Sequence, residues 1–308
     1  MDSAASQASM RSRLRRAFHA GLALPHGTEA HLAGAVRDTL QHPGSMVRAE
    51  LAFRIACAFG LSEDRAENLA IAIEYFHTAS LLFDDLPAMD DASLRRGMPC
   101  AHHVYGEGAA ILAALALINR AYSLIWKSVA GLEPEVQSEA LTYLERNLGI
   151  AGLLNGQSQD LHFSPLSQRL SDPQSIAMGK TVSLIRLALV LPAIVANATS
   201  GETRQLERLA ILWGLGYQTL DDLKDVLDTG DRHGKTAARD ARLGRPNLAL
   251  AIGIPESFDR IDRLMNLAGR LIARLVFACD RLAFLGDVRV QFNKEIANLS
   301  KASLTRAS

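Results

Sequence analysis

Two groups of acidic residues, far apart in the chain, indicate most of the chemistry to be expected from this sequence. The first group comprises Asp84, Asp85, Asp90 and Asp91, followed at once by Arg95 and Arg96. The second group comprises Asp221, Asp222, Asp225 and Asp228. Carboxylates that converge on a cavity repel one another, and hard divalent cations relieve that repulsion while leaving positions for phosphate oxygens. The two groups together predict a site for Mg²⁺ and a diphosphate.

The second group lies at the end of an apolar helical stretch. On a helix, Asp221, Asp225 and Asp228 share one face, because they are spaced by four and seven residues. Like charges at this spacing destabilise a helix unless something neutralises them. A solvated helix end is the alternative interpretation, but the apolar segment Leu212–Leu220 favours the wall of a cavity.

In the first group, Pro87 interrupts the helix just after Asp84 and Asp85. The chain must turn there, and the turn can bring Asp90 back beside Asp84. The arginines that follow suit a metal-bridged phosphate, because guanidinium groups bind the oxygens that the metal leaves unbound. An acidic turn with a compensating arginine pair on the surface is the alternative for this segment alone.

Four further residues fit an anion site, although each is weak evidence alone. Lys180 and Thr181 offer a cation and a hydroxyl group together, and Lys235 follows a glycine-rich turn. Gln218 precedes Asp221 by three residues and shares its helical face. His77, seven residues before Asp84, also shares a face with the first group, but spacing alone favours a buried core histidine there.

Helices must position these groups, because apolar residues recur at spacings of three and four along most of the chain. The helical stretches are Ala66–Phe83, Ala109–Val129, Glu139–Leu154, Ile176–Asn197 and Leu206–Leu227. Pro192 is expected to kink its helix, and Ala109–Leu117, apolar on most faces, is expected to be central. Alternating strand patterns and convincing hairpin turns are missing. The sequence predicts one all-α domain, a large helical bundle from residue 28 to 308, after an N-terminal tail of residues 1–27 that is partly disordered.

Composition limits the possible partners. The 308 residues are 48% hydrophobic, which suffices for a substantial core. Lysine plus arginine and aspartate plus glutamate both number 33, so the zero net charge argues against nucleic-acid binding. The three scattered cysteines suit a reducing compartment. The apolar stretches Ala109–Ile118 and Leu187–Ala196 are too short to span a membrane. A cytoplasmic protein without a membrane span is therefore expected.

Motifs of other enzyme classes are missing. The sequence has no phosphate-binding loop of nucleotide hydrolases, no dinucleotide fingerprint and no zinc-protease H-E-x-x-H. Serine, histidine and aspartate occur, but no nucleophile-elbow sequence arranges them as a hydrolase triad.

At this point the motifs resemble those of a known family. The segment from Phe76 to Pro99, built on Asp84-Asp85-x-x-x-x-Asp90, resembles the first aspartate-rich region of trans-isoprenyl diphosphate synthases. Gly216-Tyr217-Gln218-x-x-Asp221-Asp222-x-x-Asp225 resembles the second region. Two short segments, Gly156-Gln157-x-x-Asp160-Leu161 and Lys180-Thr181, stand where the family has the same short motifs. The closest likeness is to bacterial geranylgeranyl diphosphate synthases.

The resemblance implies the isoprenoid synthase fold, a helical bundle around a central cavity, and a homodimer. It implies a transferase that condenses an allylic diphosphate with isopentenyl diphosphate, using three Mg²⁺ ions. The implied metal ligands are Asp84, Asp90 and Asp221, with Asp85 and Asp225 in support. The implied groups at the allylic diphosphate are Lys180, Thr181, Gln218, Lys235 and Arg95. The residues implied to face isopentenyl diphosphate are Arg48, His77 and Arg96.

The sequence also departs from the family pattern. The family's early loop, in which a lysine and arginines follow a glycine, reads Gly44-Ser45-Met46-Val47-Arg48 here, so only one of its cations remains. The family's later Gly-Lys-Ser-Thr segment reads Gly244-Arg245-Pro246-Asn247. The first change removes cations from the isopentenyl diphosphate subsite rather than from the metal site. A charge-assisted hydrogen bond contributes roughly 1.5–3 kcal/mol, so acceptor binding is expected to be weakened.

Two other functions therefore stay open beside the prenyltransferase. One is a terpene synthase-like lyase that acts on a prenyl diphosphate without isopentenyl diphosphate, and the other is a non-catalytic partner subunit. Product length is expected to depend on Ala79 and Ser80, because the family's cavity floor includes the residue five before the first aspartate. Small side chains there favour a C20 product over C15.

Overall fold

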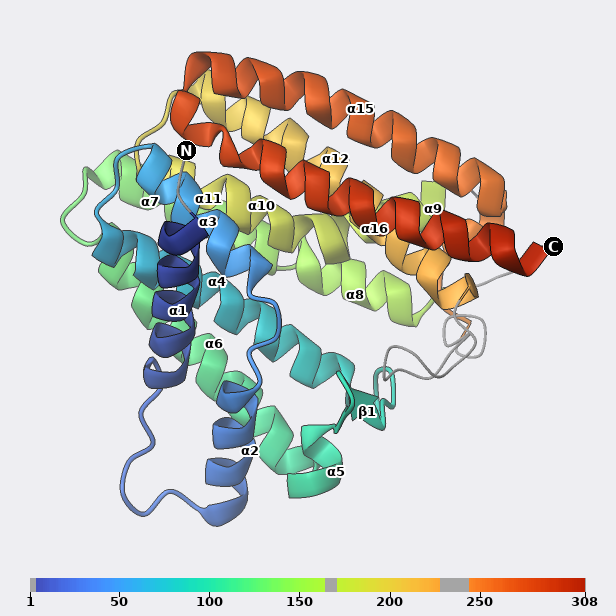
Figure 1. Cartoon of the computed structure of the whole chain (residues 1–308). Coiled ribbons are helices and arrows are strands. Elements are labelled where there is room, and N and C mark those ends of the chain that lie inside the picture. Colours follow the sequence, from blue (N-terminus) through green and yellow to red (C-terminus); the bar gives the residue numbers. More distant parts are fainter. Residues whose placement is uncertain (1–3, 164–170, 228–243, 308) are drawn as a thin grey trace. The chain divides into compact units, whose positions relative to one another are not determined.

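A computed structural model describes residues 4–163, 171–227 and 244–307 of the chain (Figure 1). Most of these residues are helical, and the described part contains one pair of strands of two residues each. The expected all-α class is therefore confirmed. The described residues form two compact units. Unit 1 comprises residues 4–140 and 194–197, and unit 2 comprises residues 141–193 and those from 198 onwards.

Unit 1 is built around helix α4. Its elements are α1 (Ala4–Ala20), α2 (Ala30–Gln41), α3 (Val47–Ala58), α4 (Glu63–Asp84), β1 (Leu94–Arg95), β2 (Met98–Pro99), α5 (Ala101–Tyr105) and α6 (Glu107–Val129). Helix α4 packs against both α3 and α6. The alanines Ala66, Ala70 and Ala72 have no exposed surface, so the neighbouring helices approach α4 closely.

Helix α1 occupies residues that we expected to form a tail. Its apolar side chains Leu14 and Phe18 are buried in unit 1. The Tyr75 hydroxyl of α4 donates a hydrogen bond to the Phe18 carbonyl oxygen at 2.7 Å. The first 27 residues therefore include a helix that packs into the core of unit 1.

Unit 2 surrounds the long helix α12. Its elements are α8 (Leu153–Leu161), α9 (Ser171–Ala177), the π-helical segment η2 (Met178–Val182), α10 (Ser183–Leu189), α12 (Ser200–Leu227), α14 (Leu248–Ile252), α15 (Ile254–Ala278), the 3₁₀ turn η3 (Asp280–Leu282) and α16 (Phe284–Ala307). Helices α7 (Pro134–Leu148) and α11 (Leu191–Val195) contribute residues to both units. Helix α12 packs against α15, α10 and η2.

The predicted helices occur, but two of them are interrupted. The stretch predicted over 139–154 ends at Leu148, because Gly149 and Gly152 break the helix before α8 begins. The stretch predicted over 176–197 divides into η2, α10 and α11. The last break falls at Val190, two residues before Pro192, which confirms the expected kink.

The position expected for the segment 109–117 is wrong. Instead of lying at the centre of unit 1, α6 exposes Leu112, Leu115, Tyr122 and Trp126 along one face. The central helix of this unit is α4, and α6 packs against it from outside.

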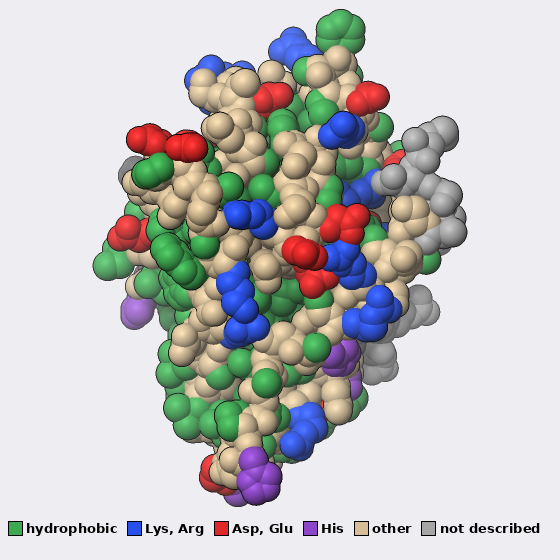
Figure 2. Space-filling model, turned by 90° about the vertical axis from the view of Figure 1, so that its left-hand side faces the viewer, with side chains coloured by type: hydrophobic (Ala, Val, Ile, Leu, Met, Phe, Trp, Pro, Cys, Tyr) green, Lys and Arg blue, Asp and Glu red, His purple; other side chains and the backbone are tan. Residues whose placement is uncertain are grey.

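The segments 107–129 and 173–195 are long and apolar enough to cross a membrane by length and composition, although no span was expected. This is weak evidence, because core helices pass the same test, and 72% of the tested part of the second segment is buried. On the face drawn in Figure 2, basic and acidic side chains are interspersed, which agrees with the zero net charge.

Candidate active site

The first acidic group forms a tight turn at the end of α4. The Asp90 N–H donates to the Asp84 carbonyl oxygen at 3.0 Å, and the Ala92 N–H donates to the Asp85 carbonyl oxygen at 3.1 Å. Asp91 adopts a left-handed conformation with φ 48°, which reverses the chain after Pro87. The turn therefore returns Asp90 to Asp84, as predicted. Asp84 and Asp90 both remain partly exposed.

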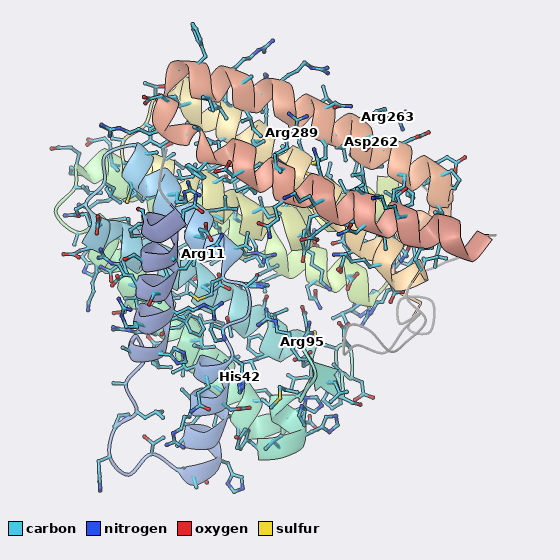
Figure 3. The ribbon with its side chains drawn as sticks, viewed as in Figure 1. Arg11, His42, Arg95, Asp262, Arg263 and Arg289 are labelled. Carbon is cyan, nitrogen blue, oxygen red and sulfur yellow. The ribbon has the colours of Figure 1, made fainter. Side chains whose placement is uncertain are left out.

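Asp85 is buried and forms an ion pair with Arg95, which Figure 3 labels near β1. The Arg95 Nε atom lies 2.9 Å from Asp85 Oδ1, and the Nη2 atom also donates to this oxygen. A two-residue hairpin presents Arg95, with Arg96 and Gly97 at φ 55° and 79° between the strands. Two successive positive φ values define a type I′ turn, in which an arginine is an unusual residue. No pattern in the sequence predicted this hairpin.

Three residues assigned to isopentenyl diphosphate lie near the start of α3. The Arg48 Nη1 atom lies 3.2 Å from His77 Nε2. Burial, followed by the charges of Arg48, Arg96 and Arg95, holds the pKa of His77 well below its usual range. His77 is therefore neutral at pH 7, and its Nε2 atom accepts the hydrogen bond from Arg48. Arg96 donates to the His42 carbonyl oxygen at 3.3 Å.

Glu74 of α4 contacts the first turn of α3, and it was not predicted as a site residue. Its buried Oε2 atom accepts a hydrogen bond from the Ala49 N–H at 3.1 Å. Ala49 lies in the first turn of α3, whose N-cap residue Met46 provides no side-chain cap. Burial raises the pKa of Glu74, and the nearby Arg48 opposes that rise. A carboxylate three residues before His77 in an apolar helix was the signal available in the sequence.

In unit 2, Lys180 and Thr181 lie in the π-helical segment η2. Such segments are rare and occur frequently at functional sites. The Lys180 Nζ atom forms an ion pair with Asp160 Oδ2 at 2.7 Å. Gly156 of α8 and Gly179 allow the two backbones to approach, because a Cβ atom on Gly156 would lie 2.4 Å from the Lys180 nitrogen. Asp160 of α8 belongs to the short motif that begins at Gly156, but no role was assigned to it from the sequence.

A chain of hydrogen bonds connects η2 to the second acidic group. The Thr181 hydroxyl donates to Gln218 Oε1, and Gln218 Nε2 donates to Asp222 Oδ1 at 2.8 Å. The other carboxylate oxygen of the buried Asp222 accepts the Leu248 N–H at 2.8 Å. Asn247 caps α14 by accepting the Leu250 N–H. Asp222 of α12 therefore binds the start of α14 and holds the Gln218 side chain in place.

Asp221 and Asp225 lie in the same helix α12 but in other environments. Asp221 is exposed and Asp225 is partly exposed, in contrast to the buried Asp222. Asp228 and Lys235, also predicted for the site, lie outside the described residues.

Comparisons with known proteins agree with these motifs. The family model for polyprenyl synthetase matches residues 29–271, which is most of the chain. The chain belongs to the polyprenyl synthetase family. It is 37% identical over 238 residues to geranylgeranyl pyrophosphate synthase 3, chloroplastic, of Arabidopsis thaliana, covering 76% of this chain and 66% of that relative. It is 34% identical over 282 residues to geranylgeranyl diphosphate synthase of Pantoea ananas, covering 90% of both proteins.

A solved structure shares the fold of this chain. It is a geranyltransferase from Helicobacter pylori, complexed with magnesium and isoprenyl diphosphate. The two structures superimpose with a TM-score of 0.81 at 25% identity, over 92% of this chain and 95% of that chain. The matched part spans slightly less than two thirds of the length of the Arabidopsis relative, but nine tenths of the Pantoea relative.

Ala79 and Ser80, which we expect to set product length, differ in burial. Ala79 has no exposed surface, whereas Ser80 is partly exposed and shares a helical face with Asp84. The Ser80 hydroxyl donates to the His77 carbonyl oxygen at 2.8 Å. Of the two, only Ser80 has surface available to a substrate in the described structure.

Within the described residues, no three histidine, cysteine, aspartate or glutamate side chains form a group that could hold a metal by themselves. The donors that the sequence assigns to metal are all carboxylates, one pair in each unit besides Asp85. Carboxylate oxygens suit Mg²⁺, which commonly uses one or two carboxylates with water and substrate phosphates. The chemistry of these donors therefore fits Mg²⁺ that is bound together with a diphosphate.

Proposed function

We propose that this protein is a Mg²⁺-dependent prenyltransferase that condenses an allylic diphosphate with isopentenyl diphosphate and produces a C20 trans-prenyl diphosphate. The observation that carries the proposal is the arrangement of Lys180, Thr181 and Gln218 in unit 2. These are three of the five residues implied to lie at the allylic diphosphate, and Asp160 and Asp222 hold them in place. Relatives with the name geranylgeranyl diphosphate synthase, at 34–37% identity, support the same product class.

In this proposal, Asp84, Asp90 and Asp221 hold the metal ions, three in number, with Asp225 in support. Bound Mg²⁺ acts as a Lewis acid that neutralises charge on the departing diphosphate. Lys180 donates hydrogen bonds to the allylic diphosphate, and Asp160 fixes the direction of its ammonium group. Thr181 and Gln218 position the allylic end of the substrate through their mutual hydrogen bond.

The bond changes follow from this placement. The allylic C–O bond breaks, and the diphosphate leaves with the electron pair. The double bond of isopentenyl diphosphate then attacks the allylic cation and forms the new C–C bond. This attack leaves a cation on C3 of the former isopentenyl unit. A proton then moves from the adjacent C2 to the departing diphosphate, and the loss of that proton forms the new C2–C3 double bond. The protein must exclude water during this sequence, because water would capture the cation and give an alcohol.

We assign the acceptor diphosphate to unit 1, where Arg96 contacts the loop before α3 and Arg48, hydrogen-bonded to His77, follows that loop. Because His77 is neutral, it adds no positive charge, and the guanidinium groups must bind the phosphate oxygens. Ser45 and Met46 contribute no cation, and Met46 is buried. This subsite is expected to bind isopentenyl diphosphate weakly unless another cation is supplied.

We also propose that the protein is a homodimer in the cytoplasm. The exposed apolar face of α6, with Leu112, Leu115, Tyr122 and Trp126, supports an interface between two copies, because large exposed apolar faces commonly bind partners. The absence of disulfides among the three cysteines supports a reducing compartment. Light scattering on the purified chain measures the mass, and a monomer at micromolar concentration would contradict the dimer.

The activity assay incubates the full chain with Mg²⁺ and farnesyl diphosphate, with and without isopentenyl diphosphate, and identifies products by mass spectrometry. We expect a C20 diphosphate only when both substrates and Mg²⁺ are present. Hydrocarbons or alcohols without isopentenyl diphosphate would support a lyase instead. No consumption of either substrate would support a non-catalytic partner subunit.

A further inference from the structure

The arginines of α1 differ in how they are neutralised. Arg11 and Arg13 form ion pairs with carboxylates of α3 and α4, and Arg16 donates to a serine hydroxyl of its own helix. Arg15 instead donates to the Gly44 carbonyl oxygen at 3.2 Å. Among the described residues, no carboxylate forms an ion pair with Arg15. Its positive charge therefore lies on the loop before α3 without a neutralising partner.

Arg96 contacts the same loop through another surface. Its Nη1 atom donates a hydrogen bond to the carbonyl oxygen of His42 at 3.3 Å. His42 is labelled in Figure 3. A Cβ atom on Gly44 would lie 2.2 Å from the Arg96 Cζ atom, so the guanidinium group packs on the glycine backbone. Gly44 also has φ 71°, and a glycine meets both requirements. Arg15 and Arg96 thus both contact the short segment that precedes Arg48.

The loop itself carries no cation. Between His42 and Val47 it reads Pro43, Gly44, Ser45 and Met46, and the Met46 side chain is buried with 4% of its surface exposed. Any positive charge at this loop must therefore come from other elements. A guanidinium group has five N–H donors, and Arg15 uses one of them for Gly44. The remaining donors match the oxygens of a phosphate in pairs.

We propose that Arg15 of α1 binds the diphosphate of isopentenyl diphosphate and supplies, from another helix, the cation that Ser45 and Met46 do not provide. This inference rests on the assignment of the acceptor diphosphate to the loop before α3. Arg15 is then a substrate-binding residue, and its effect is confined to the acceptor. The allylic diphosphate, assigned to Lys180 and Thr181, does not depend on Arg15.

The test compares Arg15→Gln with Arg16→Gln, because both side chains are exposed on α1 and only Arg15 contacts the loop. We expect Arg15→Gln to raise the KM for isopentenyl diphosphate about tenfold or more, with kcat and the allylic KM within about twofold of wild type. Arg15→Lys retains part of the affinity, and Arg16→Gln changes neither KM.

A second variant asks whether charge at this loop is the cause. Ser45→Lys returns a cation to the loop, so in the Arg15→Gln background it restores most of the lost affinity. The same substitution in wild type has a smaller effect, which a double-mutant cycle detects as coupling between the two positions. Full additivity of the two changes would overturn the proposal.

Two further results would also overturn it. One is an unchanged acceptor KM in Arg15→Gln, and the other is an equal change in both substrates together with a lower Tm. If the wild type forms no product, the proposed function fails separately. Calorimetric binding of isopentenyl diphosphate then decides the inference alone, because Arg15→Gln must weaken that binding and Arg16→Gln must not.

Discussion

Gly156→Ala tests whether the close contact between α8 and η2 positions Lys180. The added Cβ atom would lie 2.4 Å from the Lys180 nitrogen and 2.6 Å from the Gly179 carbonyl carbon. Both are backbone atoms, so no side chain can rotate away, and the two helical segments must separate. Overpacking of this kind costs roughly 1–3 kcal/mol. The same substitution also stabilises the helix by about 0.5–1 kcal/mol, because glycine loses more backbone entropy than alanine on folding.

We therefore expect the free energy of unfolding to fall by about 1–2 kcal/mol. Urea denaturation followed by circular dichroism measures this change. Displacement of η2 also moves the Lys180 ammonium group away from Asp160, which now holds it at 2.7 Å. The KM for the allylic diphosphate is then expected to rise roughly tenfold, while the acceptor KM stays constant, because one charge-assisted contact is lost.

Gly286→Ala is the matched control in α16. A Cβ atom there meets no heavy atom within 4 Å, and the residue has no positive φ. This variant should be as stable as wild type or more stable by up to about 1 kcal/mol. Equal stability of the Gly156 and Gly286 variants would refute the reasoning, because it would mean that α8 and η2 separate without cost.

Three other predictions concern product length, pH and the two adjacent aspartates of α12. Ser80→Phe should shorten the main product from C20 to C15 in a mass-spectrometric assay, whereas Ala79→Phe should lower the Tm, because Ala79 is fully buried. The folded-state pKa of His77 is depressed, so its stabilisation is present above about pH 6.5 and is lost as the pH falls. Urea denaturation at pH 7, 6 and 5 should show a decline in stability that His77→Gln reduces, and an identical decline in the variant would contradict this. Asp221→Asn should lower kcat at least tenfold and raise the Mg²⁺ requirement without changing the Tm, whereas Asp222→Ala should cost about 1–3 kcal/mol of stability, because it leaves buried donors unpaired.

Local patterns in the sequence predicted the helices and the turn of the first acidic group well. Periodicity located α4, α6 and α12, because each has apolar residues at helical spacing over many turns. Pro87 predicted the reversal that returns Asp90 to Asp84. These features depend on residues close together in the sequence, and their energies are largely local.

Features that depend on distant residues could not be predicted in this way. The hairpin around Arg96 has strands of only two residues, too short for an alternating pattern. The bonds from Glu74 to Ala49 and from Lys180 to Asp160 join residues 25 and 20 positions apart. The exposed face of α6 has the same composition as a buried face, so composition alone cannot distinguish a partner surface from a core.

Burial separates the carboxylates in and around the two acidic groups into those that hold the helices together and those that suit a metal. The buried carboxylates among the described residues are Glu74, Asp85, Asp160 and Asp222. Each accepts hydrogen bonds from a cation or an N–H group of its own unit, as a buried charge requires. In the two acidic groups, the partly or fully exposed carboxylates among the described residues are Asp84, Asp90, Asp91, Asp221 and Asp225.

A metal ligand must keep an oxygen accessible to the ion, and the second set meets that condition. Asp85 belongs to the first set, because both of its oxygens lie within hydrogen-bonding distance of Arg95 Nε. Its role in this interpretation is to hold the Arg95 guanidinium beside the acidic turn rather than to bind Mg²⁺. We therefore propose the same division of roles in each group: Asp84 and Asp221 bind the metal, while Asp85 and Asp222 hold neighbouring groups that bind the diphosphate.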